Sequence, residues 1–341
     1  LNEKAYQITI KEDGDVVEIK LENRYIRGDI EGLKLDEDGN VIAGAKFGLF
    51  KPGTTEFTEE TAVLVTESDS EGKFRFEDIR FGKWIVRELV PATGYVLNET
   101  PIEVNIQTEG EIINISFENK FIRSDIKGYK VDEDGKPVEG ALFGLFTETD
   151  TEFTEENAVL TAKSDADGIF FFDDIRFGKW IVKELAPAEG FVANDTVFPI
   201  DVTTDGAVIE INAENRHIYG MVHTTKVDKD YPDNLLAGAI FEIYMDVDGS
   251  KEFNADVDTL VGEMVEYEPG LYELENLRYG GYFLYEKQAP ASYVKDDAYH
   301  YFAIVNDGEM VEVENEAGIG FINNHMVGNL KIVKSSSDGR V

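Results

Sequence analysis

Hydrophobic and polar residues alternate along most of this chain, in short runs that end at turn residues. Up to residue 119 these runs are 28–36, 45–50, 61–66, 73–76, 83–89, 102–106 and 112–117. A period of two is typical of strands that bury one face, and no long segment keeps the helical period of 3.6 residues. Short strands separated by turn residues at this density predict an all-β fold of Ig-like or transthyretin-like β-sandwiches.

The pattern of strands repeats along the chain. The run from Arg80 to Val86 returns as the run from Arg176 to Val182, 96 residues later. A third copy is recognisable, although its loops are longer. We therefore predict three repeats at 24–119, 120–215 and 216–323, the last two strands of a preceding repeat at 1–23, and the first strand of a following repeat at 324–341. The junctions lack Pro-, Gly- or Ser-rich linkers, which favours a head-to-tail rod, and the absence of a starting Met suggests an internal fragment.

Three polar residues stand in the apolar phase of strands in every repeat. They are a Lys on an early strand, a Glu on a middle strand and an Asn on the last strand. The three sets are Lys34, Glu88 and Asn119; Lys130, Glu184 and Asn215; and Lys226, Glu286 and Asn323. Asn324 competes with Asn323, but only Asn323 is in phase with Phe321. Charged side chains rarely enter a core unpaired, so these sets require a chemical explanation.

Burial gives the three side chains a possible reaction. Desolvation lowers the pKa of a Lys and raises that of a Glu, so the amine becomes a nucleophile and the acid can hold a proton. The amine would attack the Asn carboxamide while Glu88, Glu184 or Glu286 moves protons, and ammonia would leave behind a Lys–Asn amide. Partners fixed in place react with effective molarities of about 10⁵ M or more. The alternative is a buried Lys–Glu ion pair capped by Asn, which would stabilise the fold only weakly.

Several stretches resemble one family. They are Lys34-Leu35-Asp36, Ala43-Gly44-Ala45-Lys46-Phe47, Arg87-Glu88-Leu89-Val90-Pro91 with Gly94-Tyr95, and Phe117-Glu118-Asn119. The repeats are similar to the Cna B-type, transthyretin-like domains of Gram-positive surface adhesins and pilins. The resemblance implies spontaneous isopeptide bonds between the first and last strands, at the Lys, Glu and Asn positions given above. The second repeat departs from the pattern with Phe191 for the Tyr, and the third has Ala291-Ser292-Tyr293 there.

These observations favour a structural stalk segment of an extracellular, cell-wall-anchored protein. The only reaction expected is the single intramolecular cross-link of each repeat, so we do not expect an enzyme and expect no cofactor. The expected partners are the neighbouring repeats, with a host matrix or cell-surface protein contacted through other regions. The alternative function is an adhesin module whose repeats themselves bind a host protein.

Charge and composition narrow the remaining possibilities. The net charge of −37 argues against binding to nucleic acid or an anionic membrane, and without Cys the chain has no disulfides or thiolate metal sites. An acidic loop holds Asp246, Asp248, Asp256 and Asp258. We interpret it as a solvated loop rather than a metal site, with calcium as the alternative. Arg27-Gly28-Asp29 spells an integrin-recognition tripeptide, but a strand entry that needs a small residue is the preferred interpretation.

Overall fold

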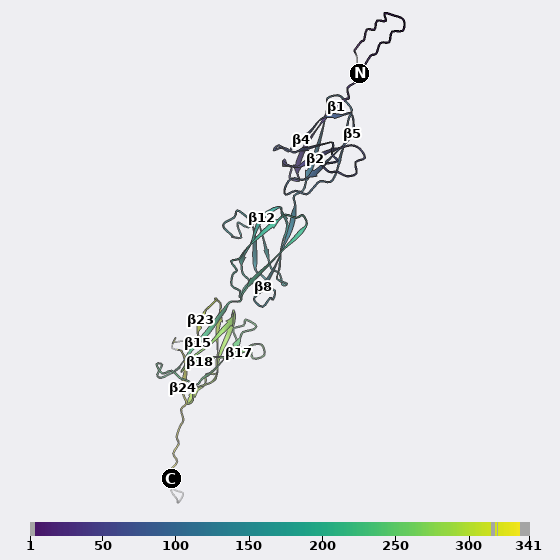
Figure 1. Cartoon of the computed structure of the whole chain (residues 1–341). Coiled ribbons are helices and arrows are strands. Elements are labelled where there is room, and N and C mark those ends of the chain that lie inside the picture. The colour runs from purple at the N-terminus through teal and green to yellow at the C-terminus, as the bar shows by residue number, and fades with distance from the viewer. Residues whose placement is uncertain (1–3, 315–317, 319, 335–341) are drawn as a thin grey trace. The chain divides into compact units, whose positions relative to one another are not determined.

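The computed structural model describes residues 4–314, 318 and 320–334, and its regular elements are strands (Figure 1). Among these residues no helix is long and apolar enough to span a membrane. The strands form consecutive pairs of sheets, which confirms the all-β, tandem β-sandwich fold predicted from the alternating pattern.

The first pair of sheets is built from the strands β1 to β7. Their bounds are β1 Arg27–Asp36, β2 Lys46–Phe50, β3 Leu64–Glu67, β4 Lys73–Arg80, β5 Gly82–Val90, β6 Ile102–Ile106 and β7 Glu111–Asn119. One sheet has the order β4-β1-β7 and the other the order β3-β2-β5-β6. In β1 every second residue is buried, as the alternation predicts, so this strand presents one face to the core between the sheets.

The first and last strands of this pair, β1 and β7, are neighbours that run parallel. Their register pairs Lys34 with Phe117 and Asp36 with Asn119. Parallel neighbours need a long connection, and here that connection is the whole of the remaining sandwich. Residues far apart in the sequence are thereby brought together at the carboxyl ends of both strands.

The second pair of sheets repeats this arrangement with strands β8 to β14. Their bounds are β8 Arg123–Asp132, β9 Leu142–Thr147, β10 Leu160–Lys163, β11 Ile169–Arg176, β12 Gly178–Ala186, β13 Val197–Val202 and β14 Ala207–Asn215. The sheet orders are β11-β8-β14 and β10-β9-β12-β13, which correspond strand by strand to the orders in the first pair.

The third pair of sheets keeps the plan but breaks its last strand in two. Its bounds are β15 Tyr219–Asp228, β16 Ile240–Met245, β17 Thr259–Glu263, β18 Val265–Glu268, β19 Leu271–Arg278, β20 Gly280–Gln288, β21 Tyr293–Val294, β22 Tyr299–Ile304, β23 Met310–Glu312 and β24 Phe321–His325. Both β23 and β24 pair with β15 in parallel, in the place of a single last strand. The break lies in the interval where the sequence of this repeat is longer than in the other two.

Two differences at one cross-strand pair accompany a different packing in the core of the third repeat. In the first repeat Gly32 lies opposite Phe74, and a Cβ on this glycine would be 2.0 Å from the Phe74 ring. That space lets Phe74 stack on Phe47 at a centroid distance of 3.8 Å. The third repeat has Thr224 opposite Tyr272, and there the Tyr272 ring meets Phe241 edge-on at 5.0 Å.

The segments outside the three pairs of sheets contain no strands among their described residues. The sequence predicts two strands within 1–23 and one within 324–341, yet residues 4–26 and 326–334 have none, and their apolar side chains are largely exposed. Residues 1–3 and 335–341 lie outside the described residues. An isolated hairpin without a sheet to pack on is marginal in water, which accounts for the difference.

Candidate functional site: a buried Lys, Glu and Asn in each repeat

In the first repeat, Lys34, Glu88 and Asn119 meet between the two sheets. Lys34 lies near the end of β1 and Asn119 at the end of β7, in the same sheet, while Glu88 comes from β5 in the facing sheet. The exposed fractions are 0%, 1% and 2%, respectively. The inward phase that the sequence predicts for these three residues is thus the phase seen in the structure.

The distances place Glu88 between the amine and the carboxamide. Lys34 Nζ lies 3.8 Å from Glu88 Oε1, and Asn119 Nδ2 donates a hydrogen bond of 2.9 Å to the same oxygen. The amine also donates to the backbone carbonyls of Leu35 at 3.3 Å and Phe117 at 3.4 Å. The Asn119 carbonyl oxygen is buried and has no hydrogen-bond partner.

Burial shifts the pKa values of both titratable groups toward their neutral forms. Desolvation lowers the pKa of Lys34 from 10.5 to about 8, although the nearby Glu88 carboxylate opposes the shift. Desolvation also raises the pKa of Glu88, against the hydrogen bond from the Asn98 backbone and the charge of Lys34. At pH 7 about one Lys34 amine in ten is then neutral, against roughly one in three thousand for an ordinary Lys.

The second repeat reproduces this site closely. Lys130 Nζ lies 4.0 Å from Glu184 Oε1, and Asn215 Nδ2 donates to the two oxygens of Glu184 at 2.9 and 3.1 Å. Desolvation again lowers the pKa of Lys130 and raises that of Glu184. The Asn215 carbonyl oxygen is also buried without a hydrogen-bond partner.

The third repeat brings the same groups closer together. Lys226 Nζ lies 3.0 Å from Glu286 Oε1, although the two atoms are not aligned for a hydrogen bond. Asn323 Nδ2 donates to Glu286 Oε2 and to the Val294 carbonyl, both at 2.9 Å. Burial lowers the pKa of Lys226 to about 8, and its amine lies 4.4 Å from the centre of the Phe321 ring.

The orientation of the Asn carboxamide differs from the one that the reaction requires. The sequence-based hypothesis has a protonated Glu that donates to the Asn carbonyl oxygen. In the structure the amide nitrogen faces the carboxylate and the oxygen has no partner. A charged carboxylate can only accept, so it selects the NH₂ side, whereas a protonated Glu88 would favour the amide turned by half a rotation.

Sequence reasoning missed a fourth position that holds the Glu in place. The backbone N–H groups of Asn98, Asn194 and Asp296 each donate a hydrogen bond of 2.7 Å to Oε2 of the buried Glu of their repeat. Each lies 10 residues after its Glu, and each side chain accepts from the backbone two residues later, in an Asx turn. The constant spacing of 10 residues after the Glu was the signal in the sequence that could have identified this position.

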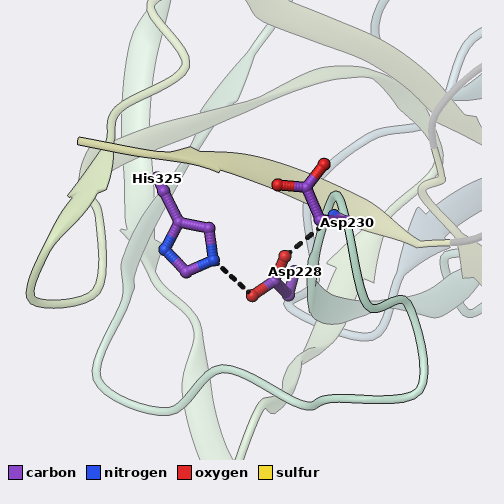
Figure 2. Close-up of side chains that lie close together, drawn as sticks. All are labelled: Asp228, Asp230 and His325. Carbon is purple, nitrogen blue, oxygen red and sulfur yellow. Dashed lines mark hydrogen bonds and ion pairs between the residues drawn. The ribbon is translucent and has the colours of Figure 1, made fainter. Parts of the chain in front are cut away.

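In a cluster near the third site, one carboxylate, that of Asp228, accepts several hydrogen bonds from its neighbours. Figure 2 shows Asp228 facing His325, whose Nε2 lies 2.9 Å away, with the Asp230 backbone bonded to the same carboxylate. The Tyr293 hydroxyl donates to Asp228 at 2.7 Å and is the largest cause of the lowered pKa of Asp228. The side chains of Asp228, Asp230 and His325 have the spacing of metal ligands, but nothing further points to a cation here.

Two other motifs from the sequence can be placed. The charged side chains of Arg27 and Asp29 are engaged within the first repeat, where Arg27 pairs with Asp78 and Asp29 lies 2.5 Å from Arg75. In the acidic loop of the third repeat, Asp246, Asp248 and Asp258 bring carboxylate oxygens within 4.8 Å of one another. Asp256 is not a member of that cluster, and its backbone N–H bonds to Asn254.

Comparison with known proteins places these repeats in a family. The model of the SpaA prealbumin-like fold domain matches residues 28–121, 124–217 and 220–317. Prealbumin is another name for transthyretin, so the match confirms the expected transthyretin-like resemblance. No curated protein matches this chain.

Solved structures match this chain at low sequence identity. The Bacillus anthracis TIE protein is 23% identical with a TM-score of 0.69, and the match covers 84% of this chain and 50% of that one, so the chain spans half its length. BcpA, the major pilin subunit of Bacillus cereus, is 16% identical with a TM-score of 0.43, covering 88% of this chain and all of BcpA. The major pilin SpaD of Corynebacterium diphtheriae is 14% identical with a TM-score of 0.29, covering 88% and 98%. From the three family matches, the chain belongs to the SpaA prealbumin-like fold domain family.

Proposed function

We propose that this chain is a stalk segment of a Gram-positive cell-surface or pilus-like protein, with a Lys–Asn isopeptide bond inside each repeat. The observation that carries the proposal is the buried meeting of amine, carboxyl and carboxamide between the sheets of all three repeats. A buried ion pair alone is a poor stabiliser, so its presence in each repeat favours a chemical use.

The proposed reaction forms one amide bond and releases one ammonia. The neutral Lys34 amine attacks the side-chain carbonyl carbon of Asn119, and a protonated Glu88 donates to the carbonyl oxygen as it gains charge. Glu88 then takes a proton from the attacking nitrogen and delivers one to the departing NH₂ group. The Asn C–N bond breaks, the Lys–Asn C–N bond forms, and no oxidant or external co-reactant is needed.

The strand arrangement gives the bond a mechanical role. A pull along the chain enters the first repeat through β1 and leaves it through β7, and these strands are paired neighbours. A covalent link between Lys34 and Asn119 would carry that force between the two strands, so the hydrogen bonds of the sheets would not have to resist it. This supports a load-bearing segment that presents other regions of the protein.

The proposal is tested by the intact mass of the whole denatured chain. Three cross-links lower the mass by three ammonias relative to the sequence. The mass of Glu88→Ala should fall short of its sequence mass by only two ammonias. The mass of the triple variant at Glu88, Glu184 and Glu286 should equal its sequence mass. Glu103→Ala, which changes an exposed residue of β6, serves as the control and should keep the full deficit. A wild-type mass equal to that of the unmodified sequence would contradict the proposal.

The alternative, in which the repeats bind a host protein directly, remains a separate prediction. The first two repeats are closely alike and the third differs in its loops, so a ligand-binding surface would be expected on the third. A binding screen that compares the third repeat with the first separates the two functions.

A further inference from the structure

The acidic loop between β16 and β17 contains a buried carboxylate oxygen that lacks a partner. Asp246 is 6% exposed and Asp258 is 8% exposed, so both carboxylates are largely removed from water. Asp246 Oδ2 accepts the Lys251 backbone N–H at 3.1 Å, but Asp246 Oδ1 has no hydrogen-bond partner. A charged oxygen that is buried and unpaired raises the free energy of the folded loop, so a positive group beside this oxygen would stabilise the loop.

The described residues supply no such positive group. Asp258 accepts backbone N–H groups from Val247 at 3.1 Å and Asn254 at 2.7 Å, and Asp248 accepts one from Ser250 at 2.9 Å. Within the described parts of the chain, no Lys, Arg or His side chain forms an ion pair with these three carboxylates. Three acidic groups therefore lie close together without an ion pair, although several backbone N–H groups donate to them.

Comparison of the same turn in the other repeats shows that the Asp258 carboxylate is an addition to it. The backbone N–H of Asp258 donates to the Asn254 carbonyl at 2.8 Å. The corresponding residues of the first and second repeats are Ala62 and Ala158, and each makes the same bond four residues back, at 3.1 Å. The turn thus forms without an acid, so Asp258 is not required by the backbone conformation.

We propose that Asp246, Asp248 and Asp258 form a Ca²⁺-binding site. Calcium binds carboxylate oxygens at about 2.3–2.6 Å, so two ligands on one ion lie up to about 5 Å apart. The oxygens of the three side chains lie within 4.8 Å of one another, which fits a single ion with little movement of the loop. Waters complete the coordination. This proposed site is independent of the isopeptide chemistry, and it takes the calcium alternative of the sequence analysis in preference to the solvated loop.

The test is a calorimetric titration of CaCl₂ into the whole chain at physiological ionic strength, which suppresses diffuse binding to the acidic surface. The wild-type chain is expected to bind one ion. Asp246→Asn and Asp258→Ala, the latter introducing the residue of the other two repeats, should weaken binding at least tenfold. Asp256→Asn removes a neighbouring charge outside the cluster and should bind like wild type. No binding by wild type, or equal weakening by all three variants, overturns the site.

Terbium luminescence provides a second readout of position. The Tyr301 hydroxyl and Asp246 Oδ2 both lie beside Gly281, because a Cβ placed on this glycine would be 2.9 Å from the first atom and 3.1 Å from the second. Tyr301 is therefore close enough to the site to sensitise a bound lanthanide. Tb³⁺ emission excited through tyrosine should fall in Tyr301→Phe while its calcium titration stays unchanged. Emission that persists in Asp258→Ala at wild-type strength would contradict the assignment.

Discussion

Asn119 donates a hydrogen bond of 2.9 Å to Glu88 across the two sheets of the first repeat, while its own carbonyl oxygen is buried without a partner. The bond fixes the carboxamide beside the Lys34 amine before any reaction. The unpartnered oxygen is the atom on which negative charge would develop during attack. Burial raises the pKa of Glu88, which favours its protonated form, and a protonated Glu88 would favour the turned amide whose oxygen accepts from it.

Loss of the cross-link should lower the stability of the first repeat. A Lys34–Asn119 bond closes a loop of 85 residues, and by analogy with a disulfide Asn119→Ala should cost about 4–5 kcal/mol of unfolding free energy. Urea unfolding can be followed through Trp84 alone in a Trp180→Phe background, because the chain has two Trp residues.

The control for this measurement is Lys46→Ala, which removes the surface ion pair with Glu59. Exposed pairs contribute at most about 1 kcal/mol, so this change should be small. Equal effects of Asn119→Ala and Lys46→Ala would argue that no covalent loop is present.

The uncrosslinked site should make stability depend on pH in a defined direction. In Asn119→Ala the Lys34 amine remains, with a folded pKa near 8 against 10.5 when unfolded. Between these values the unfolded chain binds more protons, so stability should rise as the pH increases from about 8 to 10.5, by up to about 3 kcal/mol. The urea midpoint reported by Trp84 measures it. The Lys34→Met, Asn119→Ala double variant should lack this rise, and the same rise in both variants would assign it to other groups.

The backbone donor of Asn98 should be needed to position Glu88. Asn98→Pro removes the N–H that bonds Glu88, so the first cross-link should be lost and the intact mass should show a deficit of two ammonias. Asn98→Asp is the matched control, because the third repeat has Asp296 at this place, and it should keep three. Native Trp84 fluorescence confirms folding in each variant. A three-ammonia deficit in folded Asn98→Pro would show that this donor is dispensable.

The sequence alone was sufficient for the sandwich and for the three polar positions, because alternation reports directly which side chains face inward. Lys34 and Glu88 stood out as charges in an apolar phase. Asn98 did not, because its contribution comes from its backbone, which any residue but Pro supplies. The Asn119 amide orientation also depends on the protonation of Glu88, which composition and spacing cannot give.

Strand ends were harder to predict than strand identity. The run from residue 61 reads as a strand, yet β3 begins at Leu64, because Thr61 closes a turn with Thr58 through hydroxyl and backbone bonds. Hydroxyl side chains that bond the local backbone compete with the sheet ladder. The division of the last strand of the third repeat into β23 and β24 likewise follows from local chain length, which period alone does not reveal.

Mechanical pulling should distinguish a linked from an unlinked repeat. With all three bonds formed, a single-molecule pull on the whole chain should show almost no unfolding steps from the three repeats. Lys34→Ala releases residues 35–118, so one step of up to about 300 Å should appear. Lys46→Ala, which leaves the proposed site intact, should add no step. Identical extension of wild type and Lys34→Ala would mean that only ordinary packing holds the repeats.

The parallel pairing of β1 with β7 also bears on resistance to proteolysis. A bond from Lys34 to Asn119 makes residues 34–119 a closed ring, with the chain entering and leaving at the same link. One hydrolysed peptide bond between those residues would open the ring without severing the protein. A protease could then cut an exposed loop such as 51–63 while the chain stays covalently continuous from residue 27, through the Lys34–Asn119 bond, to the next repeat. Each repeat would tolerate one such cut, whereas an open chain is divided by the first.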